Sequence, residues 1–143
     1  MTQTTSRGRV LGLDLGDVRI GVAISDDERR LAVPLGTVRT GAPHDLRAIA
    51  ELVREHGVAL VVVGHPRSLS GERGEAARKA EAFAEALRAV LPVPVVLQDE
   101  RLSTAEAERA LREAGAGGRR RRRAVDRSAA TVILQAYLDA HRT

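Results

Sequence analysis

Three acidic sites stand at the ends of apolar segments in this sequence, and they are Asp14, the pair Asp99–Glu100, and Asp126. A carboxylate at the end of a core element costs free energy unless a cation gathers beside it. A divalent metal ion that also binds phosphate would meet this requirement, because carboxylate oxygens are its preferred protein ligands. The first hypothesis is therefore a metal-dependent reaction at a phosphate group.

The positions of these acids favour a shared site. If Asp14 and Glu100 end neighbouring parallel strands, their backbones stand about 4.8 Å apart. That separation suits one divalent ion, or two ions roughly 3.5–4 Å apart that are bridged by phosphate. Asp126 precedes Ala130, Ile133 and Tyr137 at helical spacing, so it shares the helix face that must pack on the sheet. We expect its side chain to point inward.

Each acid also has an ordinary interpretation. Asp14 could pair with Arg19, the Asp99–Glu100 pair could bind Arg101 at the surface, and Asp126 could complement the dipole of its helix. These alternatives stay open for each site alone. Together the acids favour the metal hypothesis, because one fold must bring all of them to the same end of a sheet.

The elements that position these acids follow from hydrophobic periodicity and from glycine and proline signals. We expect strands at 9–15, 19–25 and 31–38, a helix at 43–56, a strand at 58–63, a helix at 75–91, a strand at 95–97, and helices at 103–115 and 125–141. Pro34 predicts that the third strand lies at a sheet edge, and the residues from Gly64 to Gly74 read as a loop. The order predicts an α/β fold with a five-stranded mixed sheet flanked by helices, the fourth strand beside the first.

Composition limits the class of protein. The 143 residues, 43% hydrophobic and 29% charged, predict one globular domain over 1–143, with 1–7 and 115–123 flexible. The absence of cysteine excludes disulfides and thiolate metal sites. No apolar run approaches the length of a membrane span. We therefore expect a cytoplasmic protein that does not bind membrane.

Charge and aromatic content indicate how a nucleic acid would be bound. The net charge is +4, and the five consecutive arginines Arg119, Arg120, Arg121, Arg122 and Arg123 account for its positive sign. Such a run is either a docking point for a polyanion or a solvated loop. Phe83 and Tyr137 are the only aromatic residues apart from histidine, and both lie on apolar helix stripes. We therefore expect contacts with phosphates rather than stacking on unpaired bases.

Four blocks of sequence resemble the YqgF/RuvX family, which is related to Holliday junction resolvases within the RNase H-like superfamily. The blocks are Gly12–Gly16 with Arg19–Ala23, Gly64–Pro66 with Ser70–Gly71, Asp99–Thr104, and Val125–Asp126 with Ala129–Ala130 and Ile133–Gln135. The resemblance implies an RNase H-like fold with sheet order 3-2-1-4-5. It also implies a nuclease that depends on Mg²⁺ or Mn²⁺ and processes the 5′ end of pre-16S rRNA.

The resemblance assigns roles residue by residue. Asp14, Glu100 and Asp126 would be the catalytic acids and metal ligands, with Asp99 as a further candidate ligand. Arg19 would lie near the phosphate, and Arg101 and Ser103 would support the middle acid. Apart from the resemblance, the charge of the arginine run 119–123 predicts that it clamps the nucleic-acid backbone.

Two features depart from the family and its superfamily. His65 stands where the family usually has an apolar residue, and it could be a tolerated loop residue, a substrate contact or a proton shuttle. The superfamily commonly has an acid at the end of the fourth strand, whereas here the acid follows the fifth. Glu100 must then reach across an extra strand spacing of about 4.8 Å, so two bound metals without substrate are not expected.

Other functions remain open on the sequence. A Holliday junction resolvase-like enzyme would cut branched DNA, and a non-catalytic ribosome assembly factor would bind RNA without turnover. The segment Asp14–Gly16 also resembles the phosphate loop of actin-like ATPases, although 143 residues do not supply the second lobe that such enzymes need. We expect a monomer or a weak homodimer.

Overall fold

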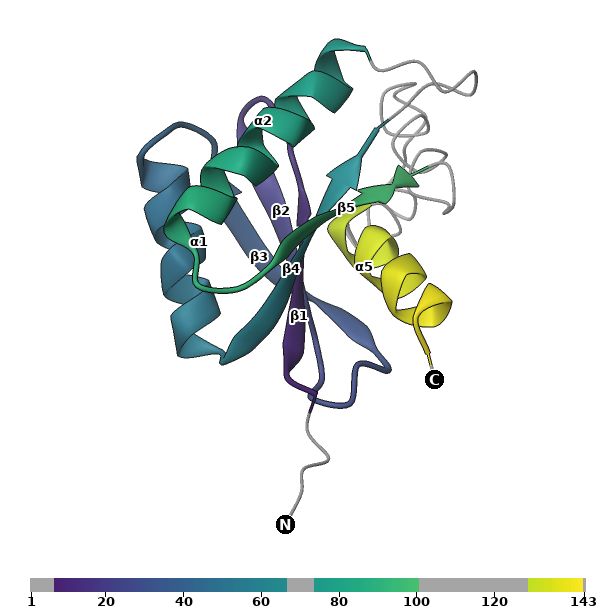
Figure 1. Ribbon diagram of the computed structural model, residues 1–143. Coiled ribbons are helices and arrows are strands. Elements are labelled where there is room, and N and C mark those ends of the chain that lie inside the picture. Colours follow the sequence, from purple (N-terminus) through teal and green to yellow (C-terminus); the bar gives the residue numbers. More distant parts are fainter. Residues whose placement is uncertain (1–6, 67–73, 101–128, 143) are drawn as a thin grey trace, which may run out of the picture.

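The computed structural model describes residues 7–66, 74–100 and 129–142, and its centre is one mixed β-sheet (Figure 1). Its five strands are β1 (Arg9–Asp14), β2 (Arg19–Ser25), β3 (Ala32–Arg39), β4 (Val58–His65) and β5 (Val95–Asp99). They lie in the order β3-β2-β1-β4-β5. The first three form an antiparallel meander, whereas β4 and β5 run parallel to β1. The predicted fold class, strand order and place of the fourth strand are confirmed.

Helices cover both faces of this sheet. Helices α1 (His44–Glu55) and α2 (Glu75–Val90) pack on one face, and α5 (Ala129–Ala140) packs on the other (Figure 1). The buried side chains form two clusters that the sheet separates. Leu11, Leu13, Val61 and Val63 face α1 and α2, whereas Val10, Leu60 and Val62 face α5. The alternation along β1 and β4 follows from the two-residue period of a strand, and it decides which face each later residue occupies.

Two strands are longer than the sequence predicted. Strand β4 continues through Gly64 to His65, and β5 continues to Asp99, because the pairs Gly64↔Gln98 and His65↔Asp99 extend the parallel ladder. The expectation of a loop beginning at Gly64 was therefore wrong at its first two residues. Glycine is a turn signal in sequence, but here its main chain is held by a neighbouring strand.

The other element boundaries agree closely with expectation. Strand β3 lies at the sheet edge, as Pro34 predicted, and the register with β2 shifts beside that proline. Gly57 follows α1 with φ of +62°, the left-handed conformation that commonly ends a helix. The predicted helix at 103–115, the start of the last helix at 125, the flexible segment 115–123 and residues 1–6 lie outside the described residues.

None of the helices in the described ranges is both long and apolar enough to cross a bilayer.

Candidate active site

A groove of about 700 Å³ opens at the end of the sheet where β1 and β4 finish. Asp14 and Glu100 line it together with the β1–β2 turn and the first half of α2. The structure therefore brings two of the three predicted acids to one concavity. Their catalytic role stays a prediction.

Glu100 follows β5 directly and is only 2% exposed. A Cβ atom placed on Gly64 would lie 2.7 Å from Oε2 of Glu100 and 2.5 Å from Cδ1 of Ile133. The Glu100 carboxylate therefore lies directly over the backbone of β4, on the face that α5 covers. The missing side chain at Gly64 leaves the space through which Glu100 crosses the intervening strand toward β1.

Asp14 ends β1 on the same face. The pairing of β1 with β4 runs to Leu13↔Val63, so Asp14 and Gly64 occupy the next positions on neighbouring strands. A Cβ atom on Gly21 would lie 3.8 Å from Cβ of Asp14 and 3.6 Å from Cβ of Ala130 in α5. Asp14 therefore lies between β2, the start of α5 and the strand that Glu100 covers.

The third predicted acid, Asp126, lies outside the described residues, four positions before Ala130. Within the described ranges, no three histidine, aspartate or glutamate side chains gather closely enough to hold a metal ion. Asp14 and Glu100 do supply the carboxylate oxygens that Mg²⁺ and Mn²⁺ prefer. The donor set at the groove thus fits a divalent metal in kind, with two acids from the described part of the chain.

The β1–β2 turn forms one wall of the groove. A Cβ atom on Gly16 would lie 2.5 Å from the carbonyl oxygen of Arg19, so only glycine fits this close approach. The hydroxyl of Thr40 donates a hydrogen bond of 2.8 Å to the carbonyl of Gly16 and ties the turn to the end of β3. Arg19 itself is exposed at the first position of β2. The turn that follows Asp14 is therefore held from both sides.

Helix α2 supplies groove residues that the sequence reasoning did not select, chiefly Lys79. Its ammonium group lies 3.3 Å from Glu75 and 3.6 Å from Asp17 across the groove. The hydrogen bond with Glu75 and the charge of Asp17 raise the pKa of Lys79. Glu75, Lys79 and Phe83 recur every four residues, so they share one helix face, and this spacing was the signal that could have identified them.

His65 is not the tolerated loop residue that the sequence permitted. It is the last residue of β4, is 9% exposed, and donates a hydrogen bond of 2.7 Å from Nε2 to the Glu81 carboxylate of α2. Like Val63 two positions earlier, it faces α1 and α2, whereas Gly64 faces α5. Its side chain therefore lies on the opposite face of the sheet from Glu100 and links β4 to α2.

The remaining predicted site residues divide into two groups. The first group is Asp99 alone, which is half-buried and lies opposite His65 in the β4–β5 ladder. The groove is lined by its neighbour Glu100 rather than by Asp99. The other group lies outside the described residues and comprises Arg101, Ser103, Arg119, Arg120, Arg121, Arg122 and Arg123.

Sequence comparison adds an independent line of support. The model of the RuvX family, described as Holliday junction resolvase, matches residues 8–140. A relative from Nocardia farcinica is 50% identical over 141 residues, covering 93% of this chain and 78% of the relative. Relatives from Thermobifida fusca and Anaeromyxobacter dehalogenans are each 51% identical, and each alignment covers 92% of this chain. The alignments cover 87% of the Thermobifida fusca relative and 96% of the Anaeromyxobacter dehalogenans relative. All three carry the name "Putative pre-16S rRNA nuclease".

Comparison with solved structures confirms the RNase H-like fold. Thermus thermophilus RuvC in complex with Holliday junction substrate superposes with a TM-score of 0.53 at 16% identity, covering 94% of this chain and 95% of RuvC. A second RuvC structure from the same organism gives 0.51 at 15% identity, covering 92% and 95%. At this identity the likeness concerns the fold alone.

Proposed function

This chain belongs to the RuvX Holliday junction resolvase family, and from that premise we propose that it is a metal-dependent nuclease that hydrolyses phosphodiester bonds in the precursor of 16S rRNA. The observation that carries the proposal is the convergence of Asp14 and Glu100 on one groove. Glu100 approaches β1 only because Gly64 has no side chain. Glu100 is only 2% exposed, and a carboxylate buried to this degree costs free energy unless a cation or hydrogen-bond donors gather beside it.

Each acid has a distinct part in the proposed site. Glu100 is buried over Gly64, where Ile133 of α5 also packs, so its carboxylate is restrained before any ligand arrives. Asp14 is half-buried at the groove wall, where it would face the phosphate of a bound substrate. Asp126 would complete the set from the turn that precedes α5, since a helical continuation places it on the face of Ala130.

Asp14, Glu100 and Asp126 would hold Mg²⁺ or Mn²⁺, which would supply an activated water and stabilisation of the leaving oxygen. The chain's own cations would position the substrate. Arg19 and the run 119–123 would bind backbone phosphates on either side of the scissile bond, and Arg101 and Ser103 would hold Glu100 in its orientation.

The choice of substrate rests on the relatives. The names of the half-identical relatives specify pre-16S rRNA, whereas the family description specifies Holliday junctions. We favour RNA because the relatives cover most of this chain and are far more similar to it than RuvC is. Branched DNA is the competing substrate and belongs in the same assay.

The test is cleavage of a pre-16S rRNA fragment, and of a four-way DNA junction, with Mg²⁺ or Mn²⁺. We expect Asp14→Asn and Glu100→Gln to lower cleavage at least a hundredfold while far-ultraviolet circular dichroism remains unchanged. Glu55→Gln, an exposed acid at the end of α1, is the matched control and should retain activity.

Two results would contradict the proposal. Undiminished cutting by folded Asp14→Asn would remove the site assignment. Tight RNA binding with no cleavage of any substrate by the unaltered protein would establish the non-catalytic assembly factor instead.

A further inference from the structure

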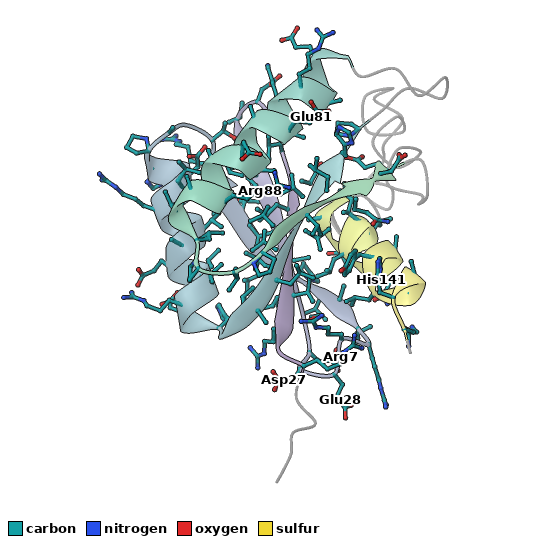
Figure 2. All side chains as sticks on the ribbon, in the orientation of Figure 1. Arg7, Asp27, Glu28, Glu81, Arg88 and His141 are labelled. Carbon is teal, nitrogen blue, oxygen red and sulfur yellow. The ribbon has the colours of Figure 1, made fainter. Side chains whose placement is uncertain are left out.

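A second concavity, of about 330 Å³, lies at the opposite end of the sheet from the acidic groove. Its walls come from the segment before β1, the β2–β3 turn and the end of α5, and comprise Arg7, Arg29, Tyr137, Leu138, His141 and Arg142. Figure 2 shows Arg7 and His141 at one end of the molecule and Glu81, which holds the end of β4, at the other. Strand β1 separates the two sites by six residues, or roughly 17 Å.

One cation of this hollow, Arg29, is held in place by backbone carbonyls. Arg29 donates from Nε to the Gly8 carbonyl at 2.9 Å and from Nη2 to the Arg7 carbonyl at 2.8 Å. It adopts φ of +59°, a conformation uncommon outside glycine, asparagine and aspartate. Burial and the nearby positive charge of Arg7 lower the pKa of Arg29. An anion between these two guanidinium groups would relieve their repulsion.

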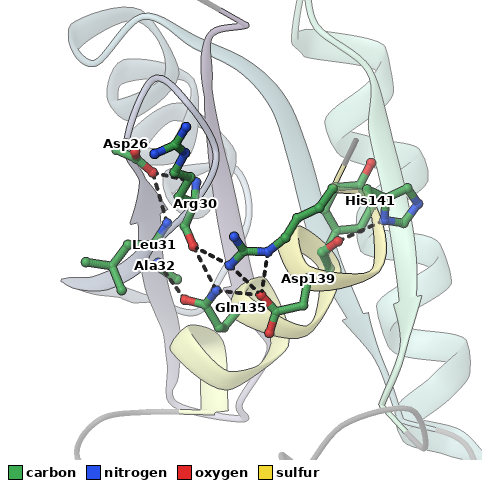
Figure 3. A network of polar contacts seen from close by, with 9 residues as sticks. Asp26, Arg30, Leu31, Ala32, Gln135, Asp139 and His141 are labelled. Carbon is green, nitrogen blue, oxygen red and sulfur yellow. Dashed lines mark hydrogen bonds and ion pairs between the residues drawn. The ribbon is translucent and has the colours of Figure 1, made fainter.

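Arg142 is held in a similar way at the end of α5. It donates to Asp139 Oδ1 from Nη2 and Nε at 2.8 and 3.1 Å, and to the Arg30 carbonyl at 3.0 Å. Gln135 bonds the same Arg30 carbonyl and the same Asp139, so that one polar network fixes the helix end against the β2–β3 turn (Figure 3). Arg142 is thereby positioned before any ligand binds.

Donor groups remain for a ligand. Within the described ranges, the bonds of Arg29 and Arg142 engage Nε and Nη2 but not Nη1, and the Arg7 guanidinium forms no hydrogen bond or ion pair. Asp139 offsets one of the three positive charges through Arg142, which leaves the hollow cationic. Arginine suits a phosphate because its donors form a planar fork.

A flat surface adjoins these donors. The rings of Tyr137 and His141 stack with their centroids 4.0 Å apart and their planes at 21°. Nδ1 of His141 donates to the Tyr137 carbonyl at 2.8 Å, so the imidazole is held although it is exposed. A nucleotide base can stack on the outer face of such a ring. The expectation of phosphate contacts without base stacking was based on Phe83 and Tyr137 alone. It left out histidine, whose ring can also support a base.

We infer that this hollow is a second nucleic-acid site, in which Arg7, Arg29 and Arg142 bind a backbone phosphate of single-stranded RNA and His141 supports the adjoining base. The inference goes beyond the proposed nuclease function, because it needs neither Asp14 nor Glu100 nor a metal ion. The site would hold a strand whose cleavage point lies in the acidic groove roughly 17 Å away. Its role would be to retain and orient the substrate.

The experiment measures binding of a short single-stranded RNA by fluorescence anisotropy, with EDTA present so that no cleavage occurs. The test variant is Arg7→Gln/Arg142→Gln. The matched control is Arg47→Gln/Arg54→Gln on α1, which removes the same charge from the other face of the sheet. Arg47, like Arg7, has no described side-chain partner, and Arg54 pairs with Glu51 three residues earlier as Arg142 pairs with Asp139.

If both arginines contact phosphates, the plot of log affinity against log salt concentration should become shallower, its slope decreasing in magnitude by about 1.4. Affinity at about 0.1 M salt should then fall about 25-fold. The control should change neither quantity. Should the double variant melt at a lower temperature, Arg7→Gln alone carries the test, with an expected slope change of about 0.7.

Three results would overturn the inference. The first is a test variant that binds RNA as the control does. The second is a pair of observations: uridine monophosphate shifts the NMR signals of the His141 imidazole, but the test variant binds RNA with unchanged affinity. These would assign the hollow to free nucleotides. The third is a protein that binds polyglutamate but not RNA, with the polyglutamate binding weakened in the test variant. That result would assign the hollow to an acidic protein partner.

Discussion

The carboxylate of Glu100 lies over the backbone of Gly64, on the strand next to the one that Glu100 follows. This relationship explains how an acid after the fifth strand can serve a site at the end of the first. The two residues are 36 positions apart in the sequence, and each is uninformative alone. In the proposed site, their contact would place a carboxylate over the end of the fourth strand, although the acid itself follows the fifth.

A side chain at position 64 should therefore disrupt the site. The Cβ of Gly64→Ala would meet Glu100 at 2.7 Å and Ile133 at 2.5 Å, closer than atoms can approach, so both must move. We expect a loss of about 1–3 kcal/mol in the free energy of unfolding, together with a loss of cleavage larger than that destabilisation explains. Urea denaturation and the cleavage assay measure the two effects.

Gly74→Ala is the control for this substitution. Gly74 precedes α2 with φ of −78°, and no atom lies within 4 Å of the added Cβ. Gly74 is the N-cap of α2, where alanine is less favourable than glycine, so the change should cost about 0.5–1 kcal/mol and leave cleavage unchanged. If Gly64→Ala kept full activity and stability, Glu100 would not depend on the space above Gly64.

The hydrogen bond between His65 and Glu81 should contribute to stability by joining β4 to α2. Removing His65 in His65→Leu takes a partner from the half-buried Glu81 carboxylate. We expect a cost of about 1–3 kcal/mol in the free energy of unfolding. Adding Glu81→Leu should recover part of that cost, because an apolar pair leaves no carboxylate without this partner.

A double-mutant cycle over these two positions measures the coupling by urea denaturation. Two single effects that simply add would show that the pair contributes nothing beyond its separate side chains. Cleavage activity should be lowered less by His65→Leu than by Glu100→Gln, since His65 does not line the acidic groove and lies on the opposite face of the sheet from Glu100. A larger loss of cleavage would restore the proton-shuttle interpretation.

Asp26 predicts a pH dependence of stability in the acid range. Its carboxylate accepts hydrogen bonds from the backbone N–H groups of Leu31 and Arg30 at 3.0 and 2.8 Å, and these bonds lower its pKa from the ordinary 3.8. Because the folded pKa is the lower one, the stabilisation is fully present above the ordinary value. It is lost as the pH falls through the folded pKa.

The measurement is the melting temperature of Asp26→Asn and of the unaltered protein between pH 7 and pH 2. We expect the variant to be less stable at pH 7 and the two melting temperatures to converge below the folded pKa. Asp139→Asn is the comparison, because side-chain bonds from Arg142, rather than backbone N–H groups, lower the pKa of Asp139. Parallel curves for the Asp26 variant and the unaltered protein would show that Asp26 does not titrate with folding.

Periodicity in the sequence was sufficient to predict the architecture. The alternation in β2, the continuous apolar run 58–63 and the helix stop at Gly57 are local signals, and each led to the correct element. Gly64 and His65 were misassigned because a turn signal says nothing about a partner strand that can hold the same backbone extended. Lys79 was missed because its place at the groove depends on Asp17, which belongs to a distant turn.

By itself the sequence determined the order and type of the elements and the place of the fourth strand beside the first, because these follow from local periodicity and from rules of chain connection. The full strand order 3-2-1-4-5 was implied by the resemblance to the YqgF/RuvX family. Only the tertiary structure decided that Glu100 lies over β4 at Gly64, that His65 bonds α2 on the opposite face of the sheet, and that Arg7, Arg29 and Arg142 share one hollow. Those relationships depend on side-chain packing between segments far apart in the chain, which no local pattern encodes.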